Sequence, residues 1–149
     1  MMIALGADHG GYNLKEAIIE YLKEKDIEYT DYGCYSEELV DYAVYAKKVA
    51  DAVVSSKADK GILCCGTGIG ISIAANKVKG IRAAVVTNEF CAEMTRRHND
   101  ANILAMGGRV IDPQTAVKLT DIFLNTEFEG GRHQRRIDQI TKIENGEDL

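Results

Sequence analysis

The chain has 149 residues, of which 46% are hydrophobic, so it is long enough to bury a core. Its net charge of −5 argues against a nucleic-acid-binding surface, and no apolar run approaches the ~20 residues that a membrane span needs. The first residues lack the basic and then apolar pattern of a signal peptide, and we expect a cytoplasmic protein. The spacing of the four cysteines and three histidines predicts neither a disulfide framework nor a metal site. Without a linker or an internal repeat, residues 1–149 are expected to form one domain.

Apolar runs and helical periodicity alternate along the chain. Apolar or alternating segments predict strands at 3–7, 27–32, 61–65, 82–87 and 103–106, and the fourth of these is expected to be buried. Helical spacing predicts helices at 14–22, at 46–53 and at about 88–98, the glycine turn at 66–70 is expected to open another, and a last helix is expected from about 132. Asp112 and Pro113 form a typical helix start. This alternation predicts an α/β fold with a parallel sheet covered on both faces.

The glycine-rich turn after Cys65 is the most informative segment. Gly66, Gly68 and Gly70 allow a ligand to approach the backbone, and N–H groups at a helix N-terminus stabilise negative charge on a substrate oxygen. The same positive end of the helix favours the thiolate of Cys65, which makes this side chain a candidate base or nucleophile. Cys64 points to the opposite face of the strand and is expected to be structural.

Other interpretations of this turn were weighed. A glycine turn at the end of a strand is common in α/β domains without any catalytic role. A dinucleotide-binding fingerprint would need glycine where Ile71 stands, and the Gly-Lys-Ser/Thr of a phosphate-binding Walker loop is absent.

Ligands of parallel α/β sheets bind beyond the carboxyl ends of the strands. Three segments follow predicted strands and are therefore expected to crowd one edge of the sheet: Asp8 with His9, Cys65 to Gly70, and Gly107 to Arg109. His98 and Asn99 instead close a helix, where a histidine beside the negative end of the helix dipole is a common structural arrangement.

The last predicted helix carries an unusual arc. At ~100° per residue, this arc contains Arg132, His133, Arg136, Ile137, Ile140 and Ile143. Charged residues normally avoid a buried arc, so two arginines one turn apart suggest a clamp for phosphate or carboxylate. The structural alternative is a pair of arginines that extend from the edge of a core-facing helix to solvent.

Four segments in order, at 6–11, 65–77, 98–102 and 130–136, resemble the type B ribose-5-phosphate isomerases. The same family includes galactose-6-phosphate isomerase subunits and allose-6-phosphate isomerases. The resemblance implies a three-layer α/β/α sandwich with a Rossmann-like parallel sheet of about five strands. It also implies a homodimer or tetramer whose active sites are shared between subunits, and no metal or organic cofactor.

The resemblance implies the reversible conversion of D-ribose 5-phosphate to D-ribulose 5-phosphate, a step of the non-oxidative pentose phosphate pathway. A base must remove the proton from C2 and return it to C1 while an enediolate is stabilised. The matching base is Cys65, assisted by the hydroxyl of Thr67. Backbone N–H groups of Gly66, Thr67, Gly68, Ile69 and Gly70 would hold the enediolate oxygens.

The remaining roles also come from the resemblance. His98 matches the residue that opens the furanose ring, which replaces the structural interpretation given above. Asp8 would contact the sugar hydroxyls or relay their protons, and Asn99 would hydrogen-bond them. The implied phosphate-binding residues are His9, Arg109, Arg132 and Arg136.

Two alternatives remain at this point. A six-carbon aldose phosphate needs the same proton transfer, so allose 6-phosphate or galactose 6-phosphate is an alternative substrate. A non-catalytic module that binds a phosphate ligand is the alternative from another class, but it gives Cys65, Thr67 and His98 no joint role. One branch of the family uses a glutamate base after the turn, where this chain has Ile71.

Overall fold

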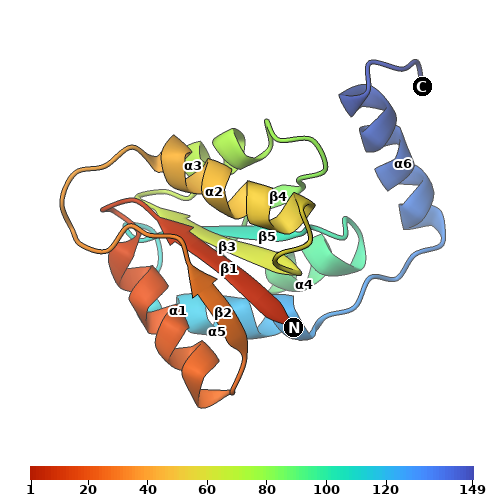
Figure 1. The fold of residues 1–149 in the computed structure, drawn as a ribbon. Helices are drawn as coiled ribbons and strands as arrows, with labels where there is room; N and C mark the ends of the chain where they lie inside the picture. Colours follow the sequence, from red (N-terminus) through yellow and green to blue (C-terminus); the bar gives the residue numbers. More distant parts are fainter.

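The computed structural model describes residues 1–149 and contains five strands and six helices (Figure 1). In chain order these are β1 (Met2–Ala7), α1 (Tyr12–Glu24), β2 (Glu28–Asp31), α2 (Tyr42–Val54), β3 (Lys60–Cys65), α3 (Ile69–Ala75), β4 (Ala83–Val85), α4 (Glu89–Arg97), β5 (Ile103–Gly107), α5 (Pro113–Asn125) and α6 (Arg132–Glu144). None of these helices combines the length and the apolar character that crossing a membrane requires.

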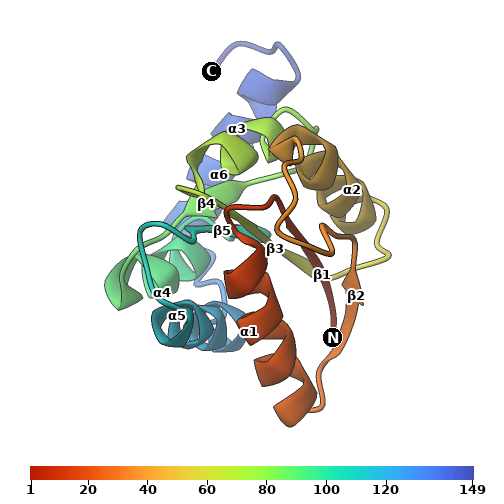
Figure 2. The ribbon, with the colours of Figure 1, turned by 90° about the vertical axis from the view of Figure 1, so that its left-hand side faces the viewer.

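The five strands form one parallel sheet in the order β2-β1-β3-β5-β4. Helices α2 and α3 cover one face, and α1, α4 and α5 cover the other (Figure 1). Figure 2 shows the same three layers from the side. The predicted α/β/α sandwich is therefore confirmed. Because β2 and β3 lie on opposite sides of β1, the chain reverses its direction of winding between β1 and β3, which is where such sheets bind ligands.

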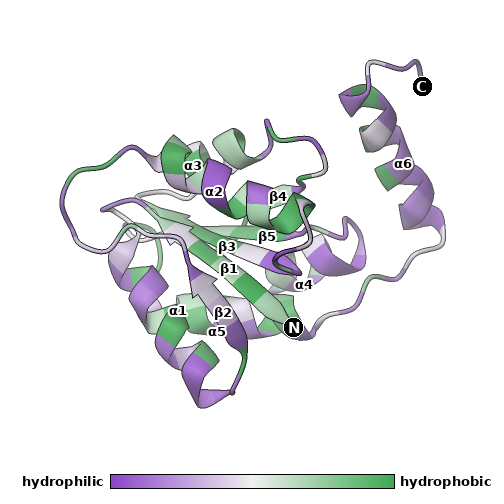
Figure 3. Ribbon diagram, in the orientation of Figure 1, coloured by the Kyte–Doolittle hydropathy of each residue, from purple (hydrophilic) through white to green (hydrophobic).

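The core has two parts, one on each side of the sheet. One part lies under α1 and α5 and includes Cys64, Leu104 and Phe123. The other lies under α2 and α3 and includes Cys65 and Ile71. The strands are accordingly apolar along most of their length, whereas the outer helix faces are hydrophilic (Figure 3). The two neighbouring cysteines thus point into different layers, as the strand geometry predicts.

The segment at 82–87 is not a buried strand. It forms only the three-residue strand β4, which pairs with β5 alone, and the side chain of Val85 is 39% exposed. The apolar run predicted burial, but a strand at the edge of a sheet has a neighbour on one side only. By contrast, the helix start at Asp112 is confirmed, because its Oδ1 accepts a hydrogen bond of 2.7 Å from the N–H of Thr115.

Helix α6 begins at Arg132 as predicted and stands away from the sandwich, beside the amino ends of the strands (Figure 1). Only His133 and Ile137 on its arc are buried, whereas Ile140 and Ile143 are about half and two-thirds exposed. These two isoleucines line an open groove of about 470 Å³ between α6 and the edge strand. The isoleucines of the arc therefore form an apolar surface that this chain covers only in part.

Candidate active site

Three loops meet at the carboxyl edge of the sheet. The register pairs Ala7 with Cys64 and Cys65 with Gly107, so the loops after β1, β3 and β5 begin at the same level. The N–H of Gly108 donates to the carbonyl of Cys65 at 2.8 Å, and the N–H of Arg109 donates to the carbonyl of Gly66 at 2.9 Å. The prediction that these segments crowd one edge is confirmed.

Glycines are required where these loops touch. A Cβ atom at Gly108 would lie 2.1 Å from the carbonyl oxygen of Gly10, and a Cβ atom at Gly10 would lie 2.9 Å from the nitrogen of Gly66. Backbone atoms cannot turn aside as a flexible side chain does, so any larger residue would push the loops apart. Gly10 and Gly108 thus allow the three loops to lie in contact.

Cys65 is only 4% exposed, and its Sγ accepts a hydrogen bond of 3.1 Å from the N–H of Gly68. Gly68 has φ of +81°, a left-handed conformation that favours glycine, and it precedes the first residue of α3. The N–H of Gly68 and the start of α3 both lie beside this sulfur. The neighbouring Cys64 is completely buried, and this burial raises the pKa of its thiol.

Side chains fill the space beside the other glycines of the turn. The guanidinium of Arg109 lies beside Gly66, and its Nη1 would be only 2.9 Å from a Cβ atom at that residue. The ring of Tyr42 lies against Gly70 in the same way, at 2.8 Å. The hydroxyl of Thr67 accepts a hydrogen bond of 3.2 Å from the N–H of Ile69, and Thr67 directly precedes Gly68, the N-cap residue of α3. No sequence signal identified Tyr42 as a neighbour of this turn.

Backbone N–H groups fix the side chains of Asp8 and His9. Asp8 is 7% exposed, and its Oδ1 accepts hydrogen bonds from the N–H groups of Gly10 at 2.9 Å and Gly11 at 3.2 Å. The Nδ1 of His9 accepts a hydrogen bond of 3.3 Å from the N–H of Val40, in the loop between β2 and α2. This bond assigns the proton of a neutral His9 to Nε2, where it is available to an anion.

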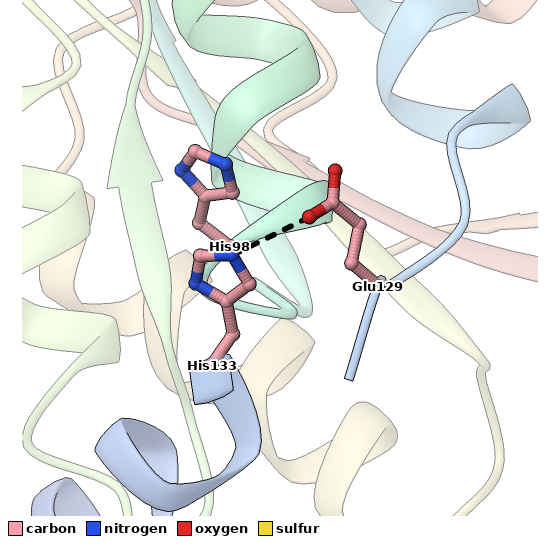
Figure 4. A group of neighbouring side chains, drawn as sticks. All are labelled: His98, Glu129 and His133. Carbon is pink, nitrogen blue, oxygen red and sulfur yellow. Dashed lines mark ion pairs between the residues drawn. The ribbon is translucent and has the colours of Figure 1, made fainter. Parts of the chain in front are cut away.

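A second cluster forms where α4 ends and α6 begins. The imidazole rings of His98 and His133 are stacked, with centroids 4.2 Å apart and planes inclined by 12° (Figure 4). The Oε2 of Glu129 lies 3.4 Å from the Nε2 of His133. Asn99 follows His98, and Arg132 and Arg136 belong to the same first turns of α6 as His133. The helical period places His133 on the arc, but no sequence signal indicates that it lies beside His98.

The turn after His98 is fixed by two arginines. Arg96 donates through Nη1 to Oδ1 of Asp100 and to the carbonyl of Ala101, both at 2.7 Å. Arg82 donates through Nε to the carbonyl of Asn99 at 2.9 Å. These charge-assisted bonds hold Asp100 at φ of +44°, an uncommon conformation for a residue other than glycine. The backbone that carries His98 is therefore well defined.

The two clusters lie at opposite ends of the parallel strands. His98 ends α4 and precedes β5, whereas Cys65 is level with Gly107 at the end of β5. The five residues of β5 span ~17 Å at ~3.3 Å per residue. One chain therefore brings Asp8, His9, the Cys65 turn and Arg109 together, and it brings His98 and Asn99 together with the start of α6, but it does not join the two groups.

The second cluster contains residue types that bind metals, which the spacing of the histidines did not indicate. The candidate ligand atoms of His98, Glu129 and His133 lie within 4.8 Å of one another. An imidazole binds a metal in the plane of its ring, and in stacked rings these directions run nearly parallel rather than toward one point. The observed arrangement fits an imidazole stack better than a metal site.

The chain is similar to known proteins along nearly its whole length. Residues 3–140 match the model of a family described as Ribose/Galactose Isomerase. The chain is 49% identical over 142 residues to the ribose-5-phosphate isomerase B of Escherichia coli, and the match covers 95% of each chain. It superimposes with a TM-score of 0.97 on the ribose-5-phosphate isomerase B of Clostridium thermocellum, at 53% identity, covering 98% of this chain and 99% of that one. The corresponding enzyme of Mycoplasma genitalium, with bound ribulose-5-phosphate, gives a TM-score of 0.91 at 45% identity, covering 97% and 96%.

Proposed function

The chain belongs to the ribose/galactose isomerase family, and from this premise we propose that it interconverts D-ribose 5-phosphate and D-ribulose 5-phosphate, with Cys65 as the base. The observation that carries the proposal is the Cys65 sulfur, which lies at the carboxyl edge of the sheet and accepts the N–H of Gly68. The loops that meet at Cys65 also carry Asp8, His9 and Arg109. Groups that can bind sugar hydroxyls and phosphate therefore lie beside the base.

The chemistry uses each of these groups. The thiolate of Cys65 takes the proton from C2 and returns it to C1, while backbone N–H groups of the turn from Gly66 to Gly70 hold the enediolate oxygens. Thr67 assists the proton transfer, and Asp8 orients the sugar hydroxyls. Because the base and the oxygen-binding groups come from one turn, their relative positions are set before substrate binds.

His98 opens the furanose ring, and a second copy of the chain supplies it. One copy contributes Asp8, His9, the Cys65 turn and Arg109, and its partner contributes His98, Asn99, Arg132 and Arg136. The separation of the two clusters in one chain supports this division, because neither group alone contains both the base and the ring-opening histidine. The incompletely covered apolar arc of α6 supports a homodimer or tetramer as the functional unit.

Turnover of ribose 5-phosphate tests the proposed substrate. We expect purified protein to form ribulose 5-phosphate faster than it converts allose 6-phosphate or galactose 6-phosphate. NMR measures each rate. The proposed mechanism uses only side chains and backbone of the protein, so dialysis against a chelator should leave the rate unchanged. A higher kcat/KM on a six-carbon substrate would instead assign the chain to that branch of the family.

Replacing either arginine of α6 should weaken substrate binding. Arg132→Ala and Arg136→Ala each remove a charge-assisted bond to phosphate worth about 1.5–3 kcal/mol, so KM should rise about 10- to 100-fold. Both side chains are exposed, so the thermal unfolding midpoint should change little. The matched control is Arg135→Ala, which removes the same charge from another face of the helix and should leave KM near the wild-type value. A normal KM with a lowered unfolding midpoint would support the structural alternative for these arginines.

A further inference from the structure

His133 is an exception on its helix. It is 3% exposed, although most of α6 is exposed, and Ile137 is the other buried residue of that helix. Its ring lies flat against the ring of His98, with centroids 4.2 Å apart.

The nitrogen Nε2 of His133 is buried and makes no hydrogen bond. Glu129 is its nearest acidic group, with Oε2 at 3.4 Å, and Arg132 and Arg136 on its own helix and His98 from α4 are the other charged or titratable groups around it. Burial, Arg132 and His98 lower the pKa of His133, against the smaller opposite effect of Glu129. This lowering favours the neutral form of the ring.

The ring of His98 makes no hydrogen bond within the chain and is stacked on the ring of His133. Its backbone is fixed by the turn described above, but the side chain is only partly buried and sits at the very end of α4. Rotation about its side-chain bonds would move the ring nitrogens away from a substrate without disturbing the backbone. The stacked ring of His133 restricts this rotation, because a flat face allows the His98 ring to slide in its own plane but not to turn out of it.

We propose that His133 is a positioning residue for ring opening, whose buried imidazole backs the ring of His98 and holds it in one orientation. The inference rests on the proposed role of His98. Because Nε2 of His133 makes no hydrogen bond and has only a 3.4 Å contact with Oε2 of Glu129, the flat ring matters more than this nitrogen atom. A phenyl ring should therefore replace the imidazole, whereas an aliphatic side chain of similar size should not.

The test compares His133→Phe with His133→Leu, and two substrates separate ring opening from proton transfer. Ribose 5-phosphate must be opened, whereas erythrose 4-phosphate cannot form a furanose because its O4 carries the phosphate. For His133→Leu we expect kcat on ribose 5-phosphate to fall about tenfold with KM nearly unchanged, and C2-proton exchange on erythrose 4-phosphate to stay within about twofold of wild type. His133→Phe should keep at least about half of the wild-type kcat on both substrates.

Ile137→Ala controls for a role in docking α6. Loss of the buried Ile137 side chain should displace α6 together with Arg132 and Arg136. This variant should therefore raise KM on both substrates, rather than lower kcat on one substrate. The inference fails if His133→Leu and His133→Phe have equal kcat on ribose 5-phosphate. It also fails if His133→Leu only raises KM, as Ile137→Ala does, or if His133→Leu loses the same activity on both substrates. Failure of the proposed function has a different signature, because His98→Ala itself would then lose activity equally on both substrates.

Discussion

Replacing Cys65 with alanine is expected to abolish isomerisation, with a fall in kcat of at least ~10³-fold, because general base catalysis contributes ~10²–10⁴-fold and this turn offers no second base. Exchange of the C2 proton with solvent should disappear at the same time, since that exchange is the first half of the reaction. Incorporation of deuterium from D₂O into ribose 5-phosphate, followed by NMR, measures it directly. Substrate binding should persist, because the phosphate-binding and hydroxyl-binding groups are unchanged.

Cys64→Ala is the matched control for this result. It removes the same thiol one residue earlier, but from the layer on the other side of the sheet. We expect it to lower the free energy of unfolding by about 1 kcal/mol through the small cavity it leaves, while kcat stays near the wild-type value. Deuterium exchange that survived in Cys65→Ala at more than a tenth of the wild-type rate would assign the base to another group.

His98→Ala should affect one substrate and spare another. Because His98 is proposed to open the ring, kcat on ribose 5-phosphate should fall ~10²-fold, as expected for loss of a general acid–base group. On erythrose 4-phosphate, which needs no opening, C2-proton exchange should remain within about threefold of wild type. Parallel assays on the two substrates with the same protein preparation give this comparison.

Asn99→Ala is a useful companion, because it removes a hydroxyl-binding group from the same turn without removing a proton carrier. We expect it to raise KM on both substrates and to show no selectivity for the ring form. A comparable loss on both substrates in His98→Ala would instead place His98 in the enediolate step.

The sequence predicts the architecture well because burial follows a simple period. Apolar runs and helical spacing identify the strands and three helices of the sandwich, and start signals at the glycine turn and at Asp112 identify α3 and α5. The rule for the carboxyl ends of parallel strands brings Asp8, Cys65 and Arg109 together. The same pattern misjudges the strand at 82–87, since an apolar run does not reveal how many neighbours a strand has. It also identifies the arc of α6 without revealing that the chain leaves most of it uncovered.

Contacts within the site were harder to predict. The spacing of Gly66, Gly68 and Gly70 indicates a close approach, but only the structure shows that Arg109 and Tyr42 occupy the space beside two of them. Likewise, His98 and His133 are 35 positions apart in sequence, and their stacking depends on where the segment between α5 and α6 returns to the end of α4. Such contacts follow from the folded path of the chain rather than from local periodicity.

The central claim is that two copies of the chain complete one site, with Cys65 from one and His98 from the other. It is tested most directly by unfolding and refolding inactive Cys65→Ala and His98→Ala chains together and assaying ribose 5-phosphate. Random pairing of equal amounts makes half of the dimers mixed, and each mixed dimer contains one intact site of two, so we predict recovery of about a quarter of the wild-type activity. If mixed dimers form, as native mass spectrometry can verify, and activity stays at the level of the separate variants, the shared site is contradicted.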